Sequence, residues 1–133
     1  MSLAVVDASV MVSFYAAEDA RRSSVAARLA AGHALFAPAH FDAEVVSALR
    51  GLARGNPVLV NTAPRALAHL AGFPVRRMPL APLLARMWRL RENFTPYDAA
   101  YVALAEQLSC TLITCDVKLA NVSGTNCEFD VIA

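Results

Sequence analysis

The sequence predicts an α/β protein, built as a single three-layer domain with a central parallel sheet of four to five strands and helices on both faces. Short apolar runs rich in β-branched residues alternate with longer segments of helical periodicity, which is the pattern of successive βαβ units. Hydrophobic residues make up 57% of the 133 residues, enough for a sizeable core in a chain of ordinary domain length. Because no repeat, low-complexity tract or linker interrupts this pattern, we assign residues 1–133 to one domain.

The predicted strands are short and apolar. The first, with the sequence LAVV, is apolar at every position, as expected for a strand that is buried on both faces of a parallel sheet. The last, with the sequence EFDVI, alternates in polarity as an edge strand does. The predicted strands span residues 3–6, 34–38, 75–79, 111–115 and 128–132.

The segments between these strands have helical patterns with recognisable ends. Gly32, Gly55 and Gly72 are expected to end helices. Thr62 is expected to cap the start of a helix that follows a connection over residues 56–61. The predicted helices span residues 9–17, 19–32, 39–55, 62–72, 81–91, 96–108 and 118–122.

The composition argues against several classes of protein. A net charge of +1 gives no global positive field of the kind that marks many nucleic-acid-binding proteins. The apolar N-terminus lacks the basic region of a signal peptide and is interrupted by Asp7, and no stretch reaches the roughly 18 apolar residues of a membrane span. Cys110, Cys115 and Cys127 form no C-x-x-C pair and are expected to be small buried thiols. We therefore predict a cytoplasmic protein that does not associate with a membrane.

Two acidic residues stand where predicted strands end. Asp7 follows the first strand, and Asp116 follows the strand over residues 111–115. Open α/β sheets bind ligands outside the carboxyl ends of their strands. If these two strands are neighbours, their terminal carboxylates lie about 5 Å apart, which is one strand spacing.

Two further acidic residues stand in apolar helical segments. Glu44 is followed four and eight residues later by Ala48 and Leu52, so its helix face is largely apolar. Asp98 is expected at the third position of the helix over residues 96–108, behind Thr95 as the N-cap. Asp7, Glu44, Asp98 and Asp116 are called the four acids below.

Each of the four acids also has a purely structural interpretation. Asp7 and Asp98 are suited to helix capping, Asp116 to a turn and Glu44 to a solvated helix face. These interpretations do not explain why all four stand in apolar surroundings. Gathered carboxylates repel one another and raise each other's pKa values, and a hard divalent cation relieves that repulsion. Because no His or Cys joins the set, the sequence predicts a Mg²⁺ or Mn²⁺ site suited to phosphate chemistry rather than a Zn²⁺ site.

The segments around the four acids resemble the motif blocks of PIN-domain proteins, and in particular the VapC-like toxins of bacterial type II toxin–antitoxin pairs. Four blocks match in the same order and spacing across the whole chain. They are VVDASV (residues 5–10), APAHFDAEVVSALR (37–50), FTPYDAAYVALAEQL (94–108) and LITCDVKLA (112–120).

This resemblance implies a Mg²⁺- or Mn²⁺-dependent endoribonuclease in which the four acids form both the catalytic and the metal site. Water is then the nucleophile and the product carries a 5′-phosphate. Asp7, Asp98 and Asp116 are expected to be direct or water-bridged metal ligands, and Glu44 either a ligand or the base that orients the attacking water. The resemblance also implies an RNA substrate, a homodimer, and a cognate antitoxin whose inserted segment blocks the site.

Three residues beside the four acids carry weaker signals. Ser9 and Thr114 flank the predicted site and either hydrogen-bond its carboxylates or serve only in capping and strand packing. Cys115 departs from the family pattern, in which a polar or basic residue often precedes the last acid. We infer no RNA contact from that position.

The charge balance gives modest support for RNA binding. Removing the four acids from the 11 acidic residues leaves 7 against 12 basic residues, a surplus of +5. Eight arginines are candidates for phosphate contacts or, alternatively, for solvated helix faces. They are Arg21, Arg22, Arg28, Arg76, Arg77, Arg86, Arg89 and Arg91.

Three rival functions remain to be weighed. A phosphoacceptor receiver domain requires paired acids after the first strand and a late lysine, but the only lysine, Lys118, follows Asp116 too closely. A phosphatase of the D-x-D type is excluded because Ser9 stands at the second acidic position. A PIN-like module that binds RNA or an antitoxin without cleavage stays open, and a metal-dependent ribonuclease assay separates it from the enzyme.

Overall fold

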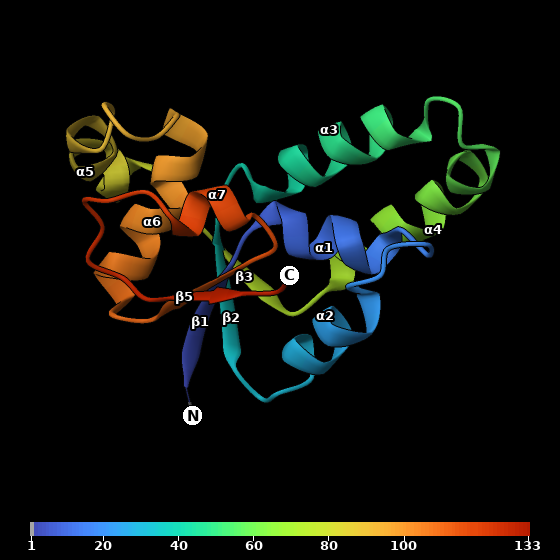
Figure 1. Cartoon of the computed structure of the whole chain (residues 1–133), viewed down its shortest axis with the longest axis horizontal. Coiled ribbons are helices and arrows are strands. Elements are labelled where there is room, and N and C mark those ends of the chain that lie inside the picture. The colour runs from blue at the N-terminus through green and yellow to red at the C-terminus, as the bar shows by residue number, and fades with distance from the viewer. Residues whose placement is uncertain (1) are drawn as a thin grey trace.

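The computed structural model describes residues 2–133, and its strands form one parallel sheet in the order β3-β2-β1-β4-β5 (Figure 1). The first strand in the sequence, β1, therefore lies at the centre of the sheet. This arrangement confirms the predicted α/β class and the parallel sheet. The strands are β1 (Leu3–Val6), β2 (Ala34–Pro38), β3 (Val75–Met78), β4 (Thr111–Thr114) and β5 (Phe129–Val131).

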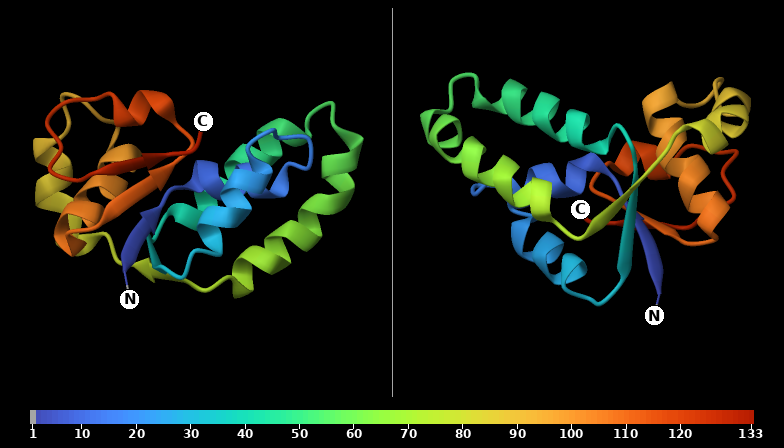
Figure 2. Two further views of the ribbon diagram at one scale, coloured as in Figure 1. Left: turned by 60° about the horizontal axis from the view of Figure 1, so that its bottom comes forward. Right: turned by 180° about the vertical axis from the view of Figure 1, so that it is seen from behind.

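Helices lie on both sides of this sheet. Figure 2 shows α5 and α6 on one face and α1 and α2 on the other, while α3 and α4 form a hairpin that extends to the side. The predicted three-layer arrangement is thus confirmed. The helices are α1 (Ala8–Tyr15), α2 (Arg22–Leu29), α3 (Phe41–Ala53), α4 (Pro57–Gly72), the 3₁₀ turn η1 (Ala81–Leu83), α5 (Leu84–Arg89), α6 (Pro96–Leu108) and α7 (Val117–Ala120).

Helix α6 is the most deeply buried of the helices that pack on the sheet. This burial explains the apolar character of its sequence. Every residue from Ala99 to Ala105 is buried, and the helix packs on β1, β2 and β4. A helix that is apolar on all sides is stable only when it is surrounded by other elements. Its alanines have small side chains, so the helix fits closely between the sheet and α5. The N-terminus of α6 is thereby held at one edge of the sheet.

The register of the central strands places two of the four acids at the same edge. In the parallel pair of β1 and β4, Val6 lies opposite Ile113, and the Asp7 N–H donates to the Ile113 carbonyl at 3.1 Å. Asp116 follows two residues after the end of β4. This confirms the expectation that the strands preceding Asp7 and Asp116 are neighbours.

The start of α4 corrects the sequence analysis. Residues 56–61 were expected to be a connection, but α4 begins at Pro57, and the Asn56 side chain accepts a hydrogen bond from the Leu59 N–H at 3.2 Å. Thr62 lies inside this helix, so its prediction as an N-cap is wrong. A proline is favoured at the first helical position because its ring fixes φ and the missing N–H would be unpaired there anyway. The helix also accommodates Pro64 in its interior.

Other differences concern element ends. Helix α2 begins at Arg22 rather than at residue 19, because the Asp19 carboxylate accepts the Arg21 N–H at 2.9 Å and forms a turn before it. The segment over residues 81–91 divides into η1 and the short α5. The strand expected over residues 75–79 ends at Met78. None of these shifts moves any of the four acids.

Two further expectations from composition concern membranes and thiols. No helix within residues 2–133 has both the length and the apolar character needed to cross a membrane. Cys115 is buried, whereas Cys110 and Cys127 are only partly buried. Burial raises the pKa of the Cys127 thiol to about 11, which keeps it protonated.

The cap at the start of α4 can be tested by substitution. Asn56→Ala removes the side-chain acceptor for the Leu59 N–H and should lower the free energy of unfolding by about 1 kcal/mol. Asn61→Ala is the matched control, because Asn61 is an exposed residue inside the same helix. Alanine is the better helix former there, so this variant should be unchanged or slightly stabilised. Urea unfolding measures both, and equal midpoints for the two variants would contradict the assignment of Asn56 as the cap.

Candidate active site

The four acids line a single pocket. This pocket has a volume of about 260 Å³ and is also lined by side chains from α1, α3 and α6. Asp7 is the N-cap of α1, Asp116 is the N-cap of α7, and Glu44 and Asp98 lie in the first turns of α3 and α6. The structure therefore brings together all four residues that the sequence singled out. The other lining residues are Ala8, Ser9, Val12, Ala48 and Tyr101.

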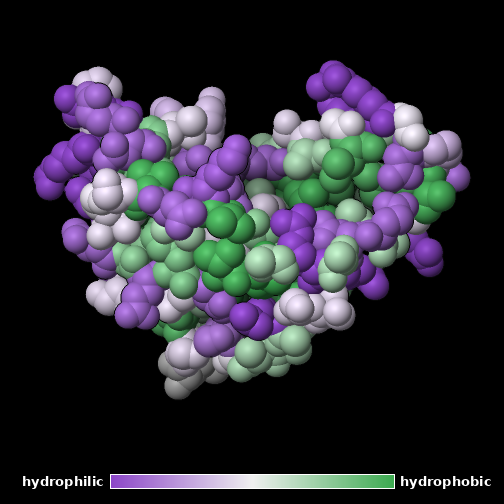
Figure 3. All heavy atoms as spheres, in the orientation of Figure 1, coloured by the Kyte–Doolittle hydropathy of each residue, from purple (hydrophilic) through white to green (hydrophobic). Residues whose placement is uncertain are grey.

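Each of the four acids stands at the beginning of a helix. Helix N-termini carry unpaired N–H groups and a partial positive charge, so carboxylates are favoured there. The space-filling view is indented between the end of the molecule that carries α5 and the end that carries α3 (Figure 3). Capping and site formation are thus compatible, because Asp7 and Asp116 cap their helices and still line the pocket that Glu44 and Asp98 share.

Asp7 is the most buried of the four acids, with 6% of its surface exposed. One of its oxygens accepts hydrogen bonds from the Ser9 N–H, at 2.8 Å, and from the Ser9 hydroxyl, while the other accepts the Thr114 hydroxyl. Burial raises the pKa of Asp7 to about 6, and the nearby Asp116 contributes to the increase. The hydrogen bonds from Ser9 and Thr114 oppose this shift without cancelling it.

The two flanking hydroxyls link Asp7 to the end of β4. The Ser9 hydroxyl oxygen accepts the Cys115 N–H at 3.0 Å, and the Thr114 hydroxyl oxygen accepts the Asp116 N–H at 2.9 Å. Asp116 in turn accepts N–H groups at the start of α7. Ser9 and Thr114 therefore hydrogen-bond directly to a carboxylate of the pocket, as one of the two interpretations of these residues expected.

Asp98 lies in the first turn of α6. The Thr95 hydroxyl accepts the Asp98 N–H at 3.2 Å, so the predicted N-cap is present and uses the backbone of Asp98 rather than its carboxylate. Burial raises the pKa of Asp98, and Glu44 and Asp116 raise it further. The charge on Asp98 is therefore a net electrostatic cost to the metal-free fold.

Glu44 is held by two residues that the sequence analysis did not identify. Its Oε1 atom accepts the Tyr101 hydroxyl at 2.5 Å and lies 3.3 Å from Nε2 of His40. Burial alone would raise the pKa of Glu44, but the hydrogen bonds from His40 and Tyr101 outweigh it and lower that pKa. His40 precedes Glu44 by four residues and Tyr101 follows Asp98 by three, so helical spacing was the available signal.

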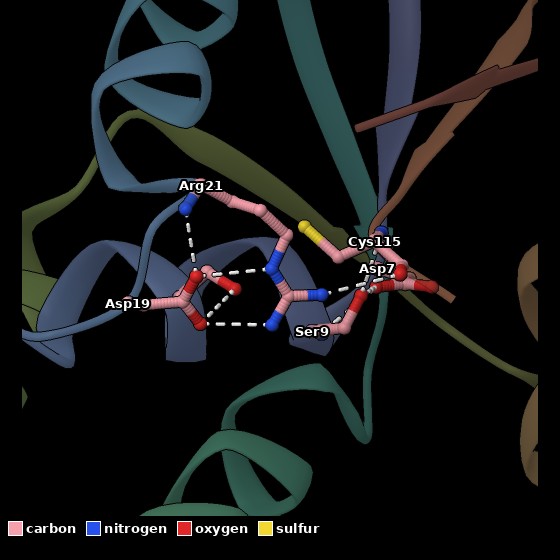
Figure 4. Close-up of polar contacts among 6 residues, drawn as sticks. Asp7, Ser9, Asp19, Arg21 and Cys115 are labelled. Carbon is pink, nitrogen blue, oxygen red and sulfur yellow. Dashed lines mark hydrogen bonds and ion pairs between the residues drawn. The ribbon is translucent and has the colours of Figure 1, made fainter. Parts of the chain in front are cut away.

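An arginine joins the loop between α1 and α2 to the same edge of the sheet. Figure 4 shows Arg21 directed toward Cys115, beside Asp7 and Ser9, and held by Asp19. Its guanidinium donates to both carboxylate oxygens of Asp19, at 3.0 and 2.8 Å, and to the Cys115 carbonyl at 3.4 Å. The side-chain hydrogen bonds from Arg21 hold the pKa of Asp19 well below its usual range. This ion pair thus braces the backbone immediately before Asp116.

Half of the eight candidate arginines form close ion pairs, at 2.6 to 2.9 Å, which favours a structural role for them. In three of the four pairs the two residues are 20 to 102 positions apart, so spacing along the chain does not indicate the pairing. The pairs are Arg21–Asp19, Arg28–Asp130, Arg77–Asp42 and Arg86–Glu106.

The chemistry of the pocket suits a hard divalent cation, although its carboxylates are not drawn together around one point. Within residues 2–133, no three His, Cys, Asp or Glu side chains are grouped so that they could hold a metal ion together. Instead, Asp7, Glu44 and Asp116 use oxygens in hydrogen bonds with the protein. The four carboxylates share one pocket, where Asp116 adds to the raised pKa values of Asp7 and Asp98, and they supply the all-oxygen donors that Mg²⁺ and Mn²⁺ prefer. The residue types and their shared location therefore fit such an ion.

Comparisons with known proteins identify the family. The family model described as "PIN domain" matches residues 4–124. Ribonuclease VapC12 of Mycobacterium tuberculosis is 39% identical over 129 residues, covering 97% of this chain and 98% of the relative. Ribonuclease VapC3 of the same organism is 47% identical over 116 residues, covering 87% and 84% of the two chains.

Solved structures share the fold. The crystal structure of PAE2754 from Pyrobaculum aerophilum has a TM-score of 0.70 and 26% identity, and the match covers 98% of this chain and 84% of the other. Mycobacterium tuberculosis VapC20, described as a Sarcin-Ricin loop cleaving toxin, has a TM-score of 0.61 and 19% identity, with 82% and 86% coverage. The match of family model, sequence relatives and fold extends over most of the chain. The protein belongs to the PIN-domain family and, within it, to the VapC proteins.

Proposed function

We propose that the protein is a cytoplasmic Mg²⁺- or Mn²⁺-dependent endoribonuclease and the toxin of a toxin–antitoxin pair. The observation that carries this proposal is the single pocket lined by the four acids, which lie at the edge of the sheet where its central strands end. Relatives named as ribonucleases cover nearly the whole chain at 39% and 47% identity, which supports the same activity here.

The reaction is hydrolysis of an RNA phosphodiester bond. A bound divalent cation would lower the pKa of a water molecule and take up charge on the phosphate. Asp7, Asp98 and Asp116 are the residues that would hold it, as direct or water-bridged ligands. Glu44 is either a further ligand or the base that orients the attacking water, and its lowered pKa keeps it in the carboxylate form that accepts a proton. The 3′ oxygen leaves, and the phosphate stays on the 5′ side of the downstream fragment.

We propose that the exposed apolar side chains of the α3–α4 hairpin belong to interfaces. Hydrophobic residues gather over this hairpin in the space-filling view (Figure 3). Large exposed apolar patches mark protein–protein contacts in soluble proteins. We assign these interfaces to a homodimer and to a cognate antitoxin whose inserted segment reaches the acid pocket. The exposed residues are Val46, Leu52, Val58 and Val60.

Cleavage should depend on the metal. The purified protein should cut RNA with Mg²⁺ or Mn²⁺ and stop when EDTA removes the ion, because four uncompensated carboxylates would repel the phosphate backbone. Gel analysis of a labelled RNA measures the cleavage. Cutting that persists in EDTA, in a preparation free of host nuclease, would overturn the proposal. Binding of RNA without cleavage in either metal would instead support the module that binds without catalysis.

Replacing Asp98 separates its catalytic and structural roles. Asp98→Asn keeps the hydrogen bond from the backbone N–H of residue 98 to the Thr95 hydroxyl. It removes a negative charge that the carboxylates of Glu44 and Asp116 repel. The melting temperature in EDTA should therefore stay level or rise, while cleavage in Mn²⁺ falls by orders of magnitude.

The matched control for this experiment is Asp42→Asn. Asp42 is also an acid in the first turn of a helix, but it lies outside the acid pocket and pairs with Arg77 at 2.9 Å. This variant should melt slightly lower and cleave normally. A lower melting temperature with near-normal cleavage in Asp98→Asn would mean that Asp98 serves the helix alone.

Assembly and toxicity can be measured together. Light scattering should give a dimer of twice the 14.2 kDa chain mass. Cells should tolerate expression poorly without an antitoxin, and tolerate the Asp98→Asn variant well because it does not cleave. If the unmodified protein were a monomer and its expression were harmless, the results would count against both the homodimer and the toxin function.

A further inference from the structure

We propose that His40 and Tyr101 are positioning residues that hold one oxygen of Glu44, so that its second oxygen is presented to the pocket at a fixed place relative to Asp98. This inference rests on the proposed function, because it assigns a purpose to the orientation of Glu44 within the acid site. Three features of the structure support it: the oxygen of Glu44 that both residues contact, the buried phenol of Tyr101, and the surroundings of the His40 ring.

Both partners of Glu44 contact the same atom. The Tyr101 hydroxyl lies 2.5 Å from Oε1, and His40 Nε2 lies 3.3 Å from that same oxygen. The other oxygen, Oε2, forms no hydrogen bond in the part of the chain that the structure describes. Because Glu44 lines the acid pocket, the free oxygen is the one available to a cation or a water molecule there. Holding a carboxylate through one oxygen is a common way to orient the other.

Tyr101 provides a rigid donor. Only 2% of its surface is exposed, and its ring is fixed within the buried helix α6. Burial, followed by the contact with Glu44, raises the pKa of the phenol far above its ordinary value. The hydroxyl therefore stays protonated, and the bond runs from Tyr101 to Glu44. Tyr101 follows Asp98 by three residues on the same helix, so Glu44 is tied to the helix that carries Asp98.

His40 occupies the N-cap position of α3 but does not cap it. Its side chain makes no capping hydrogen bond, although this position usually holds a residue that does. Instead, Nε2 donates to the Tyr97 carbonyl at 3.1 Å, and the ring packs edge-on against Tyr101 with centroids 5.2 Å apart. Its Nδ1 atom is buried without a hydrogen-bond partner among residues 2–133. A buried nitrogen without a hydrogen bond lowers the stability of the fold. The contacts of Nε2, rather than those of Nδ1, therefore account for the position of the ring.

The histidine consequently joins the starts of two helices that carry acids. It precedes Glu44 by four residues on one side, and on the other it contacts the carbonyl of Tyr97, the residue before Asp98. Glu44 and Asp98 line the same pocket, and two carboxylates placed so near each other repel. His40 and Tyr101 together keep these carboxylates at a set separation despite that repulsion. Nε2 thus donates to the Tyr97 carbonyl while the same nitrogen lies 3.3 Å from Oε1 of Glu44.

The test measures Mn²⁺ affinity by calorimetry and stability by melting in EDTA. Tyr101→Phe removes only the hydroxyl and should weaken Mn²⁺ binding by about 10- to 100-fold, with a small change in melting temperature. His40→Leu should weaken Mn²⁺ binding similarly. His40→Gln should recover much of the affinity, because its amide can donate near the position of Nε2. Tyr15→Phe is the matched control: it removes a hydroxyl bonded to His69 at 2.8 Å, away from the acid pocket, and should leave Mn²⁺ affinity unchanged.

A double-mutant cycle decides whether Tyr101 acts through Glu44. In a Glu44→Ala background, adding Tyr101→Phe should cause no further loss of Mn²⁺ affinity. The positioning role would be overturned if Tyr101→Phe bound Mn²⁺ as tightly as the unmodified protein does. It would also be overturned if Tyr101→Phe caused the same loss of Mn²⁺ affinity in the Glu44→Ala background. Either result would leave the proposed function intact. An unmodified protein that neither binds Mn²⁺ nor cleaves RNA would overturn the proposed function, and this inference with it.

Discussion

The parallel pairing of β1 with β4 at the centre of the sheet is the contact on which both the core and the acid pocket depend. It continues past the strands themselves, because the Asp7 N–H donates to the Ile113 carbonyl and the Thr114 hydroxyl joins the Asp7 carboxylate to the Asp116 N–H. Helix α6 packs across the same strands and delivers Asp98. The burial of apolar side chains in these elements stabilises the fold, and this stabilisation offsets the repulsion among the carboxylates of the pocket.

The charges of this protein fall into two groups with different surroundings. Outside the pocket, partly buried acids are neutralised by arginines in close ion pairs, as Glu106 is by Arg86 at 2.6 Å. Within the pocket, no arginine pairs with any of the four acids among the described residues, and Asp7 and Asp98 have raised pKa values. An arginine in the pocket would provide the positive charge that a bound divalent cation is expected to provide. Charged residues make up only 17% of the chain, and four of its 11 acids gather in this one pocket.

Much of this structure could be predicted from local sequence patterns, and the failures have physical causes. The strands and α6 were predictable because apolar periodicity reflects burial directly, and the four acids because they interrupt that periodicity. The start of α4 was missed because Asn56 and Pro57 are typical of loops as well as of helix starts. The contacts of His40 with Tyr97 and of Glu44 with Tyr101 depend on the approach of α3 to α6, which is a tertiary arrangement that spacing along one helix does not reveal.

The order of the site residues along the chain has a consequence for protein synthesis. The four acids stand at positions 7, 44, 98 and 116, and the central strand β4 precedes the last of them. During translation, the edge of β1 that pairs with β4 stays open until the final part of the chain emerges, and a domain of this kind folds as a unit. An incomplete chain therefore lacks both the middle of its sheet and one wall of its pocket. A ribosome that makes this protein is exposed to the assembled pocket only once the chain is nearly finished.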